Sequence, residues 1–364
     1  MINSVLLRDI ETVLNEFLED ETHVLAYERL NHQEDVYVAR VRLAGRQNLV
    51  YSAIAKHIHP DYYPVQDDYP LKPEFVEEDF NYTFLSAIQD TFDLFPRLIG
   101  RKKGLIVMED LGEIPQAVWD EDALNSLVVS FAKLHAATRN EYPRFQQMRQ
   151  AARLDDDRRF YSANHYNKLF ALGSQQLRQY CEIFQIDLSL YDEIIDCVQY
   201  AIDNPHPFFA FIHDDLVSKR QSIYIEGRQY MIDFEHGKYS HALLDICKLL
   251  VGKIEWKLKD KYYFINVPGA TVTIVENYRS AWEKFCRMIV DDSVWRKSLG
   301  DVLIYSTLTV VGELFIIPSD VKPQKSVAEN LKFLVERLVF LLKWNDSHQE
   351  FCLMCEQLTH RIYA

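Results

Sequence analysis

The sequence FIHDDLVSKRQSIYIEGRQYMIDFE, residues 211–235, decides how the rest of the chain is interpreted. Two short runs rich in β-forming residues, Ser222–Ile225 and Gln229–Ile232, are separated by the tripeptide Glu226-Gly227-Arg228. Runs of this kind, joined by a short connection that contains glycine, are typical of a β-hairpin. The sequence therefore predicts a hairpin over residues 222–232.

One acidic residue lies at each end of this predicted hairpin. Asp215 precedes the first run, and Asp233 follows the second. Strand ends hold side chains in place, and carboxylates held in this way suit Mg²⁺. Phosphoryl transfer needs such a metal site together with a carboxylate that orients a hydroxyl nucleophile. The two aspartates are therefore candidates for a phosphotransferase site.

The order of these motifs resembles the catalytic segment of the aminoglycoside phosphotransferase/choline kinase family, which consists of small-molecule kinases with a protein-kinase-like fold. The resemblance is carried by His213-x-Asp215 and, after the hairpin, by Ile232-Asp233-Phe234-Glu235. It implies that Asp215 is the catalytic base and that His213 braces the catalytic loop. It also implies that Asp233 binds Mg²⁺ on the phosphates of ATP or GTP.

The chain departs from the family pattern at two places. The family has an asparagine five residues after the base as a second Mg²⁺ ligand, but this position is Arg220, whose guanidinium has no acceptor atom. A loop longer by two residues puts Ser222 in this place, and Gln221 is also close enough to bind Mg²⁺ through its side-chain oxygen. The segment Tyr27–Asp35, where the family covers the phosphates, contains no glycine, although glycine usually lets backbone N–H groups approach phosphates.

The first third of the chain has the pattern of a small antiparallel sheet. An apolar stripe predicts a helix in residues 1–20, and alternating residues predict strands at Val36–Leu43 and Asn48–Ile58. The second strand carries Lys56. The resemblance assigns this lysine to the α/β-phosphates of the nucleotide.

A helix predicted at Phe75–Ile88 supplies a candidate partner for this lysine. Glu78 and Leu85 share one face of that helix, so the Glu78 side chain is expected to point inward. In the family, such a glutamate pairs with the strand lysine and directs it towards the phosphates. Glu77 or Asp79 takes this place if the helical register differs by one residue.

The segment Gly104–Gly112 resembles the passage between the two lobes in this family. Its sequence is GLIVMEDLG, an apolar strand followed by a turn. The resemblance implies that Met108, Glu109 and Asp110 contact the adenine edge through main-chain atoms.

The remainder of the chain has mainly helical patterns. His135 lies on the apolar face of the helix predicted at Ala123–Thr138, where a satisfied core histidine is expected. The resemblance implies that residues 139–205 help form the acceptor site and that Asp245 supports the catalytic loop from behind. Residues 271–364 are expected to form a helical cap.

Composition restricts the function classes. The chain of 364 residues has a formal charge of −14, which argues against a general nucleic-acid binder and slightly favours a cationic acceptor. The apolar run Leu299–Ile317 contains two acids and is expected to be a core helix rather than a membrane span. Cys352 and Cys355 have no second pair at zinc-site spacing, so buried thiols are expected. The N-terminus lacks a signal-peptide pattern, and we expect a cytoplasmic protein.

Together these features predict an α+β, bilobal protein-kinase-like fold. Its N-terminal nucleotide-covering lobe would span residues 1–110. Its mainly helical C-terminal lobe would span residues 111–364, with the catalytic hairpin at 211–235 and the helical cap at 271–364. The predicted function is phosphorylation of a hydroxyl on a small molecule with Mg²⁺ and ATP or GTP. The alternative is a catalytically silent kinase-like binding or structural module of the spore-coat-associated type.

Overall fold

The computed structural model describes residues 3–31, 35–45, 50–65, 71–88, 93–112, 120–154, 163–215, 222–257, 262–266, 272–316 and 327–362. The chain divides into two compact units. The first comprises Met1–Ala117 and Ser222–Gly237, and the second comprises Val118–Gln221 and Lys238–Ala364. The C-terminal lobe predicted from the sequence includes the hairpin, whereas Ser222–Gly237 groups with the first unit.

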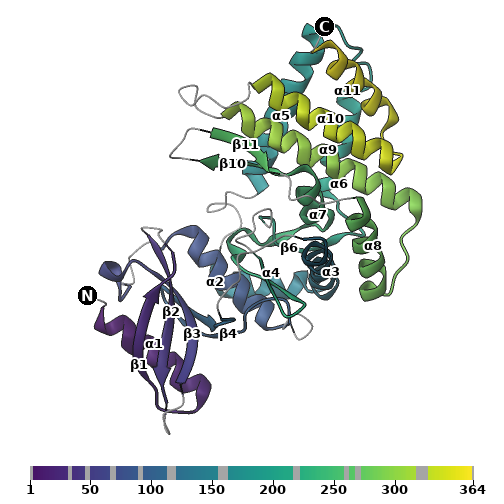
Figure 1. Ribbon diagram of the computed structural model, residues 1–364. Coiled ribbons are helices and arrows are strands. Elements are labelled where there is room, and N and C mark those ends of the chain that lie inside the picture. The colour runs from purple at the N-terminus through teal and green to yellow at the C-terminus, as the bar shows by residue number, and fades with distance from the viewer. Residues whose placement is uncertain are drawn as a thin grey trace. The chain divides into compact units, whose positions relative to one another are not determined.

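The described residues of the first unit form two α-helices and a five-stranded antiparallel sheet of order β1-β2-β3-β5-β4 (Figure 1). Its elements are α1 (Ser4–Leu18), β1 (His23–Arg29), β2 (Val36–Ala44), β3 (Val50–Ile58), α2 (Pro73–Ser86), β4 (Leu98–Lys102), β5 (Leu105–Glu109), β7 (Ser222–Ile225), β8 (Arg228–Met231) and the short 3₁₀ turns Pro60–Tyr62 and Phe234–His236. The helix and strands predicted in this part of the chain are confirmed. Strands β1 and β4 were not assigned from the sequence.

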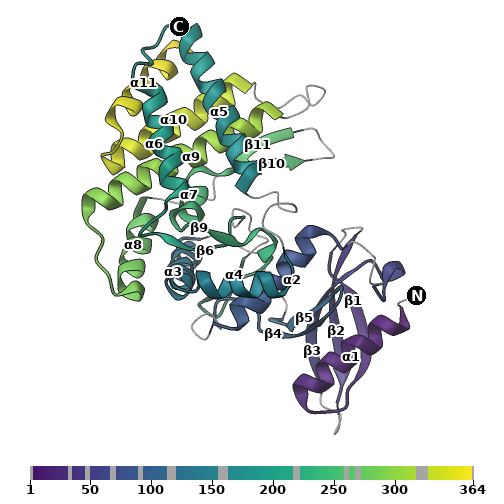
Figure 2. The ribbon, with the colours of Figure 1, turned by 180° about the vertical axis from the view of Figure 1, so that it is seen from behind.

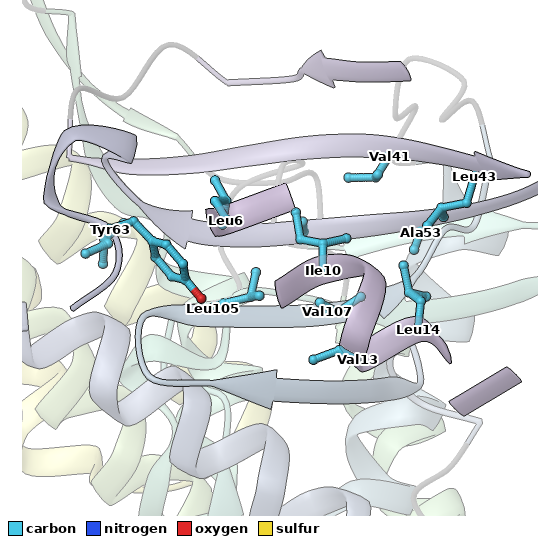
Figure 3. Close-up of a cluster of buried hydrophobic side chains, with 12 residues drawn as sticks. Leu6, Ile10, Val13, Leu14, Val41, Leu43, Ala53, Tyr63, Leu105 and Val107 are labelled. Atoms are coloured by element: carbon cyan, nitrogen blue, oxygen red, sulfur yellow. The ribbon is translucent and has the colours of Figure 1, made fainter. Parts of the chain in front are cut away.

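Helix α1 covers one face of this sheet (Figure 3). Asn3 caps the helix by accepting a hydrogen bond from the Val5 N–H, and the apolar stripe of the helix is buried on the strands. The buried cluster consists of Leu6, Ile10, Val13, Leu14, Val41, Leu43, Ala53, Ala55, Ile58, Tyr63, Leu105 and Val107. Because Ala53 and Ala55 face α1, the alternation of strand side chains turns Lys56 to the opposite face.

The hairpin differs from its prediction by one residue. Strands β7 and β8 pair from Ser222↔Met231 to Ile225↔Arg228, so the loop consists of Glu226 and Gly227 alone. Both loop residues have positive φ, 50° and 78°, which is the requirement of a type I′ turn. Arg228 therefore belongs to the second strand.

The second unit is mainly helical, as predicted (Figure 2). Its elements are α3 (Glu121–Thr138), α4 (Tyr142–Ala151), α5 (Ala163–Ile183), α6 (Tyr191–Asp203), β6 (Phe209–Ile212), β9 (Lys238–His241), α7 (Leu243–Val251), β10 (Lys253–Lys257), β11 (Tyr262–Asn266), α8 (Val272–Cys286), α9 (Asp292–Ile316), α10 (Val327–Asn345) and α11 (Gln349–Arg361). The strand pairs β6–β9 and β10–β11 were not foreseen.

Helix α9 is the core helix of the second unit. It is the one helix among the described residues that is long and apolar enough to cross a membrane, and 83% of its most apolar window is buried within the fold. This burial agrees with the expected core helix. All six cysteines lie in described segments and are free thiols, with Cys352 and Cys355 buried as predicted.

Candidate functional site

Lys56, Glu78 and Asp233 meet in the first unit. The Lys56 Nζ lies 2.7 Å from Asp233 Oδ1 and also forms an ion pair with the Glu78 carboxylate. Lys56 comes from β3, two residues before its end, Glu78 from α2, and Asp233 from the end of the hairpin. The predicted pairing of Lys56 with Glu78 is therefore present, and Asp233 joins it.

Burial and charge set the protonation of this cluster. Burial opposes the charged form of Lys56, but Glu78 and Asp233 hold its pKa above the ordinary value. Burial raises the pKa of Glu78 to about 7 although Lys56 lowers it, and Asp233 and Glu235 add to the rise. The ammonium is thus fixed as a cation, surrounded by more negative charge than it can neutralise.

Helix α2 holds the segment around Asp233 as well as Lys56. Asn81 Nδ2 donates hydrogen bonds to the carbonyls of Phe234 (2.8 Å) and Gly237 (3.0 Å). The Asp233 N–H donates to the Tyr82 hydroxyl (3.3 Å), and the Tyr82 ring packs edge-on against Phe234. Because Glu78 lies on the same helical face, one rigid element positions both the lysine and the aspartate.

The choice of Glu78 over its neighbours agrees with the contacts of this helix. The Asp79 carboxylate forms an ion pair with the guanidinium of Arg101, a β4 residue, at 2.8 Å. Glu77 is buried, but its side chain does not line the cavity beside Lys56. Of these three acids, Glu78 alone forms an ion pair with Lys56 in the described part of the chain.

A cavity of about 640 Å³ opens beside Lys56, and its described walls belong to the first unit. The lining residues are Asp35, Val36, Lys56, Lys72, Pro73, Glu74, Phe75, Glu78, Asp233 and Glu235. Carboxylate oxygens of Glu78, Asp233 and Glu235 lie within 4.8 Å of one another. Hard oxygen ligands at such spacing suit Mg²⁺.

Glu235 was not assigned a role from the sequence. It lines this cavity and is one of the three acids that could hold a metal ion. Its place two residues after Asp233, across a short 3₁₀ turn, brings both side chains to one site. The sequence signal for this role is the pair Asp233 and Glu235, two acids separated by one residue at the end of the second hairpin strand.

The proposed second metal ligands are only partly described. Gln221 and Arg220 lie outside the described residues. Ser222 is at the start of β7, and its buried hydroxyl has no hydrogen-bond partner among the described residues. An orphaned buried oxygen is costly unless a ligand satisfies it, so Ser222 stays a candidate.

The hinge residues are held mainly by their own sheet. The Asp110 carboxylate accepts hydrogen bonds from Arg40 Nε (2.8 Å), the Ser52 hydroxyl and the Gly112 N–H (2.9 Å). Burial raises the pKa of Asp110, but these hydrogen bonds outweigh burial and lower the pKa below its usual value. The Glu109 N–H donates to the Arg97 carbonyl at 2.9 Å. That main-chain donor is therefore already used within the sheet and does not face a nucleotide base.

Met108 is still a candidate for main-chain contact with the adenine edge. It is buried at the centre of the β3–β5–β4 ladder, opposite Ile54 and Leu98. The roles of Met108, Glu109 and Asp110 towards a nucleotide stay predictions.

The Tyr27–Asp35 segment continues out of the sheet. Its first residues, Tyr27–Arg29, belong to β1. The Asn31 side chain donates a hydrogen bond to the Val36 carbonyl and accepts one from the Val38 N–H. Residues 32–34 lie outside the described part of the chain.

The predicted catalytic loop lies in the second unit, where Asp245 supports it. The carboxylate of Asp245 accepts hydrogen bonds from the backbone N–H groups of His213 (2.9 Å) and Asp214 (2.8 Å). His135 Nε2 lies 3.0 Å from the same carboxylate, and His135 Nδ1 lies 2.8 Å from the Tyr278 hydroxyl. The expected supporting role of Asp245 and the expected core role of His135 agree with these contacts.

The side chains of this loop have different environments. His213 is fully buried, which suits a bracing residue rather than one that meets substrate. Asp214 has a positive φ of 65°, a conformation that aspartate tolerates better than most residues. Asp215 lines a cavity of about 280 Å³ whose described walls belong to the second unit.

The chain is similar in structure to small-molecule kinases. It shares 14% identity with choline kinase from Cryptosporidium parvum Iowa II, covering 93% of each chain with a TM-score of 0.49. It shares 12% identity with Plasmodium vivax ethanolamine kinase, covering 88% of this chain and 83% of that one with a TM-score of 0.48. For macrolide 2'-phosphotransferase from Brachybacterium faecium the identity is 14%, with 91% and 98% covered and a TM-score of 0.46.

No protein-family model matches the chain, and no match was found among curated proteins. The roles of individual residues therefore rest on this chain's own contacts.

Proposed function

We propose that this protein is a phosphotransferase that uses Mg²⁺ and ATP or GTP to phosphorylate a hydroxyl of a small molecule. The observation that carries the proposal is the buried ammonium of Lys56, held between Glu78 and Asp233 at the wall of an acidic cavity. A buried lysine fixed by two acids is suited to neutralise phosphate oxygens without reorganising.

The charges of this cavity support the metal requirement. Among the described residues, five acids and two lysines line it, so a nucleoside triphosphate meets net negative charge there. Divalent cations offset the repulsion between these acids and the phosphates. Asp233 and Glu235, with Ser222 or Gln221 as a further oxygen donor, would hold the metal, and the bound metal would neutralise charge on the phosphates.

The catalytic base would be Asp215. Its loop is fixed from behind by Asp245, and its side chain lines a cavity large enough for a small acceptor. In this role Asp215 would orient the acceptor hydroxyl and take its proton, because phosphoryl transfer depends mainly on positioning and electrostatics.

Thermal unfolding with and without Mg²⁺, ATP and GTP tests this proposal. A ligand that binds only the folded protein stabilises it by about 2.7 kcal/mol at a hundredfold excess over its Kd. We expect a midpoint shift that requires Mg²⁺ and is lost in Asp233→Asn. The matched control is Asp61→Asn, an exposed acid of the same unit, which should keep the shift.

The alternative, a catalytically silent binding module, is favoured by the glycine-free segment Tyr27–Asp35 and by the absence of the family's asparagine, whose position is Arg220, or Ser222 if the loop is two residues longer. If neither nucleotide shifts the midpoint at millimolar concentration with Mg²⁺ present, the phosphotransferase proposal is wrong and the silent module is the better description.

A further inference from the structure

Helix α7 binds both main-chain polar groups of Asp214, the residue before the proposed base Asp215. The Asp214 N–H donates a hydrogen bond to the Asp245 carboxylate at 2.8 Å. The Lys248 ammonium donates one hydrogen bond to the Asp214 carbonyl and another to Asp214 Oδ1, the latter at 2.5 Å. Asp245 and Lys248 are three positions apart on α7 and therefore share one face of the helix. One helix thus fixes the Asp214 backbone at its N–H and at its carbonyl.

The conformation of Asp214 gives this contact a consequence for Asp215. Asp214 has a φ of 65°, in the left-handed region, which non-glycine residues keep only where their surroundings hold them. A rotation of Asp214 out of this region would redirect the chain that follows it, and the next side chain is that of Asp215. Asp215 lines the cavity of about 280 Å³. The direction of its carboxylate therefore depends on the backbone of Asp214.

The Asp214 side chain is a second point of attachment. It is only 2% exposed, and Lys238 Nζ of β9 lies 2.7 Å from its Oδ2 while Lys248 binds its Oδ1. Burial raises the pKa of Asp214, but the two lysines outweigh burial and lower the pKa, so the carboxylate stays ionised. A carboxylate bound at both oxygens resists rotation of the backbone that carries it.

Lys248 is itself held in place. Its Nζ lies 4.4 Å from the centre of the Tyr166 ring, a distance typical of a cation–π contact. Burial lowers the pKa of Lys248, but Asp214, Tyr166 and Asp215 outweigh burial and raise the pKa above its ordinary value. The ammonium is therefore a fixed cation that interacts with Asp215 as well as with Asp214.

We propose that Lys248 is a positioning residue for the catalytic base: it holds the Asp214 backbone in the left-handed conformation that directs the Asp215 carboxylate into the cavity. This role deepens the proposed function and rests on it, because phosphoryl transfer depends mainly on positioning and electrostatics. The alternative role of Lys248 is compensation of the buried Asp214 charge alone. The two roles differ once the acid and the base are removed together.

Four variants separate these roles. Lys248→Met removes the ammonium, and Lys248→Arg keeps a charged donor. Asp214→Asn/Lys248→Met removes one acid and one base, so the net charge of the cavity is kept, and asparagine tolerates a positive φ as aspartate does. The control is Lys297→Met, which breaks the ion pair with Asp301, another buried acid of the second unit.

Urea unfolding and hydrogen exchange test the role of Lys248 without turnover. We expect Lys248→Met to speed exchange of the His213 and Asp214 amides about tenfold beyond what its loss of global stability explains. The double variant should regain most of the stability but not the slow exchange, because the Asp214 carbonyl still lacks its donor. Lys248→Arg should keep the slow exchange. Lys297→Met should exchange these amides only as fast as its own loss of stability explains.

Hydrolysis of ATP or GTP with Mg²⁺ gives the catalytic result. Water is the acceptor: its oxygen bonds to the γ-phosphorus, its proton passes to Asp215, and the nucleoside diphosphate leaves with the electron pair of the broken P–O bond. We expect Lys248→Met and the double variant to lower kcat by about 10- to 100-fold. The KM for the nucleotide should stay unchanged, because the Lys56 cavity lies in the other unit. Lys248→Arg should restore most of the kcat.

Each outcome decides between the roles. If the double variant regains both the slow exchange and the wild-type kcat, Lys248 only compensates charge and the positioning role is wrong. The positioning role is also wrong if Lys248→Met exchanges its amides and turns over like the wild type. If wild-type protein does not hydrolyse nucleotide with water, exchange alone decides.

The two proposals fail separately. A Mg²⁺-dependent nucleotide shift in thermal unfolding, together with wild-type exchange and kcat in Lys248→Met, rejects the positioning role alone. The absence of any nucleotide shift in the wild type rejects the phosphotransferase, and the catalytic role of Lys248 with it.

Discussion

Lys56 Nζ lies 2.7 Å from the Asp233 carboxylate, although 177 positions separate the two residues in the sequence. The contact joins the centre of the sheet to the end of a hairpin, and Glu78 of α2 completes it. A cluster of one base and two acids, assembled from three distant segments, is expensive to bury and is therefore expected to respond strongly to substitution.

Replacing Lys56 should reveal this cost. Lys56→Met leaves Glu78 buried without its cation, and we expect a loss of about 3–5 kcal/mol in the free energy of unfolding. The double variant Lys56→Met/Glu78→Gln removes the buried charge and should recover a large part of that loss. Both variants should bind nucleotide at least tenfold more weakly. Urea unfolding and calorimetry measure these effects, and equal stability of the single and double variants would contradict the ion-pair account.

Asp215→Asn tests the catalytic base. An amide cannot accept the hydroxyl proton, so kcat should fall by about 10²- to 10⁴-fold. The nucleotide affinity should stay unchanged, because the Lys56 cavity lies in the other unit. Asp196→Asn, an exposed acid on α6, is the control and should keep full turnover. Turnover of Asp215→Asn at the wild-type rate would remove Asp215 from this role.

Asp245 should matter although it is too deeply buried to meet a substrate. Asp245→Asn places an amide donor against one of the N–H groups of His213 and Asp214, which costs about 1–3 kcal/mol. We expect a lower urea midpoint and a lower kcat. Tyr278→Phe, which removes one hydroxyl further along the same network, should have a smaller effect on kcat. The supporting role is excluded if Asp245→Asn keeps wild-type stability and kcat.

Local periodicity was enough to predict the elements that carry the first site. The strand with Lys56 and the helix with Glu78 follow from alternation and from helical spacing, because each pattern lies within one element. The hairpin was predicted with a three-residue loop. The positive φ of Glu226 allows a two-residue turn, and this conformation is not evident from the side chain.

Contacts between distant segments were beyond sequence reasoning. The position of Asn81 in the sequence does not predict its hydrogen bonds to the carbonyls of Phe234 and Gly237. The pairing of Lys238 and Lys248 with Asp214 likewise depends on how β9 and α7 pack beside the catalytic loop. Such contacts depend on tertiary packing, which one sequence without a template does not specify.

His57 should make the stability depend on pH. Its ring is buried, with Nε2 2.6 Å from the Tyr27 hydroxyl, and burial lowers its pKa from 6.5 to about 4. The unfolded state therefore binds more protons between these values, so stability falls as the pH drops from about 6.5 to 4. A shift of this size corresponds to about 3 kcal/mol. Urea unfolding at pH 4 to 7 should show a shallower pH dependence for His57→Gln than for the wild type; parallel curves would contradict this origin.

The close approach of α5 and α9 links packing to the second cavity. A Cβ on Gly312 would lie 2.0 Å from the Leu169 carbonyl oxygen, so an alanine there forces the two backbones apart. Because these helices carry Tyr166 and Ser306, the cavity should change shape with them. Gly312→Ala should cost about 3 kcal/mol and weaken acceptor binding.

Gly300→Ala is the matched control for this prediction. It lies on the same helix, but the atoms nearest to its added methyl group belong to the side chains of Ser347 and His348 rather than to another helix backbone. We expect a smaller loss of stability than for Gly312→Ala. If the two variants unfold at the same urea concentration, backbone contact between α5 and α9 does not set the shape of the cavity.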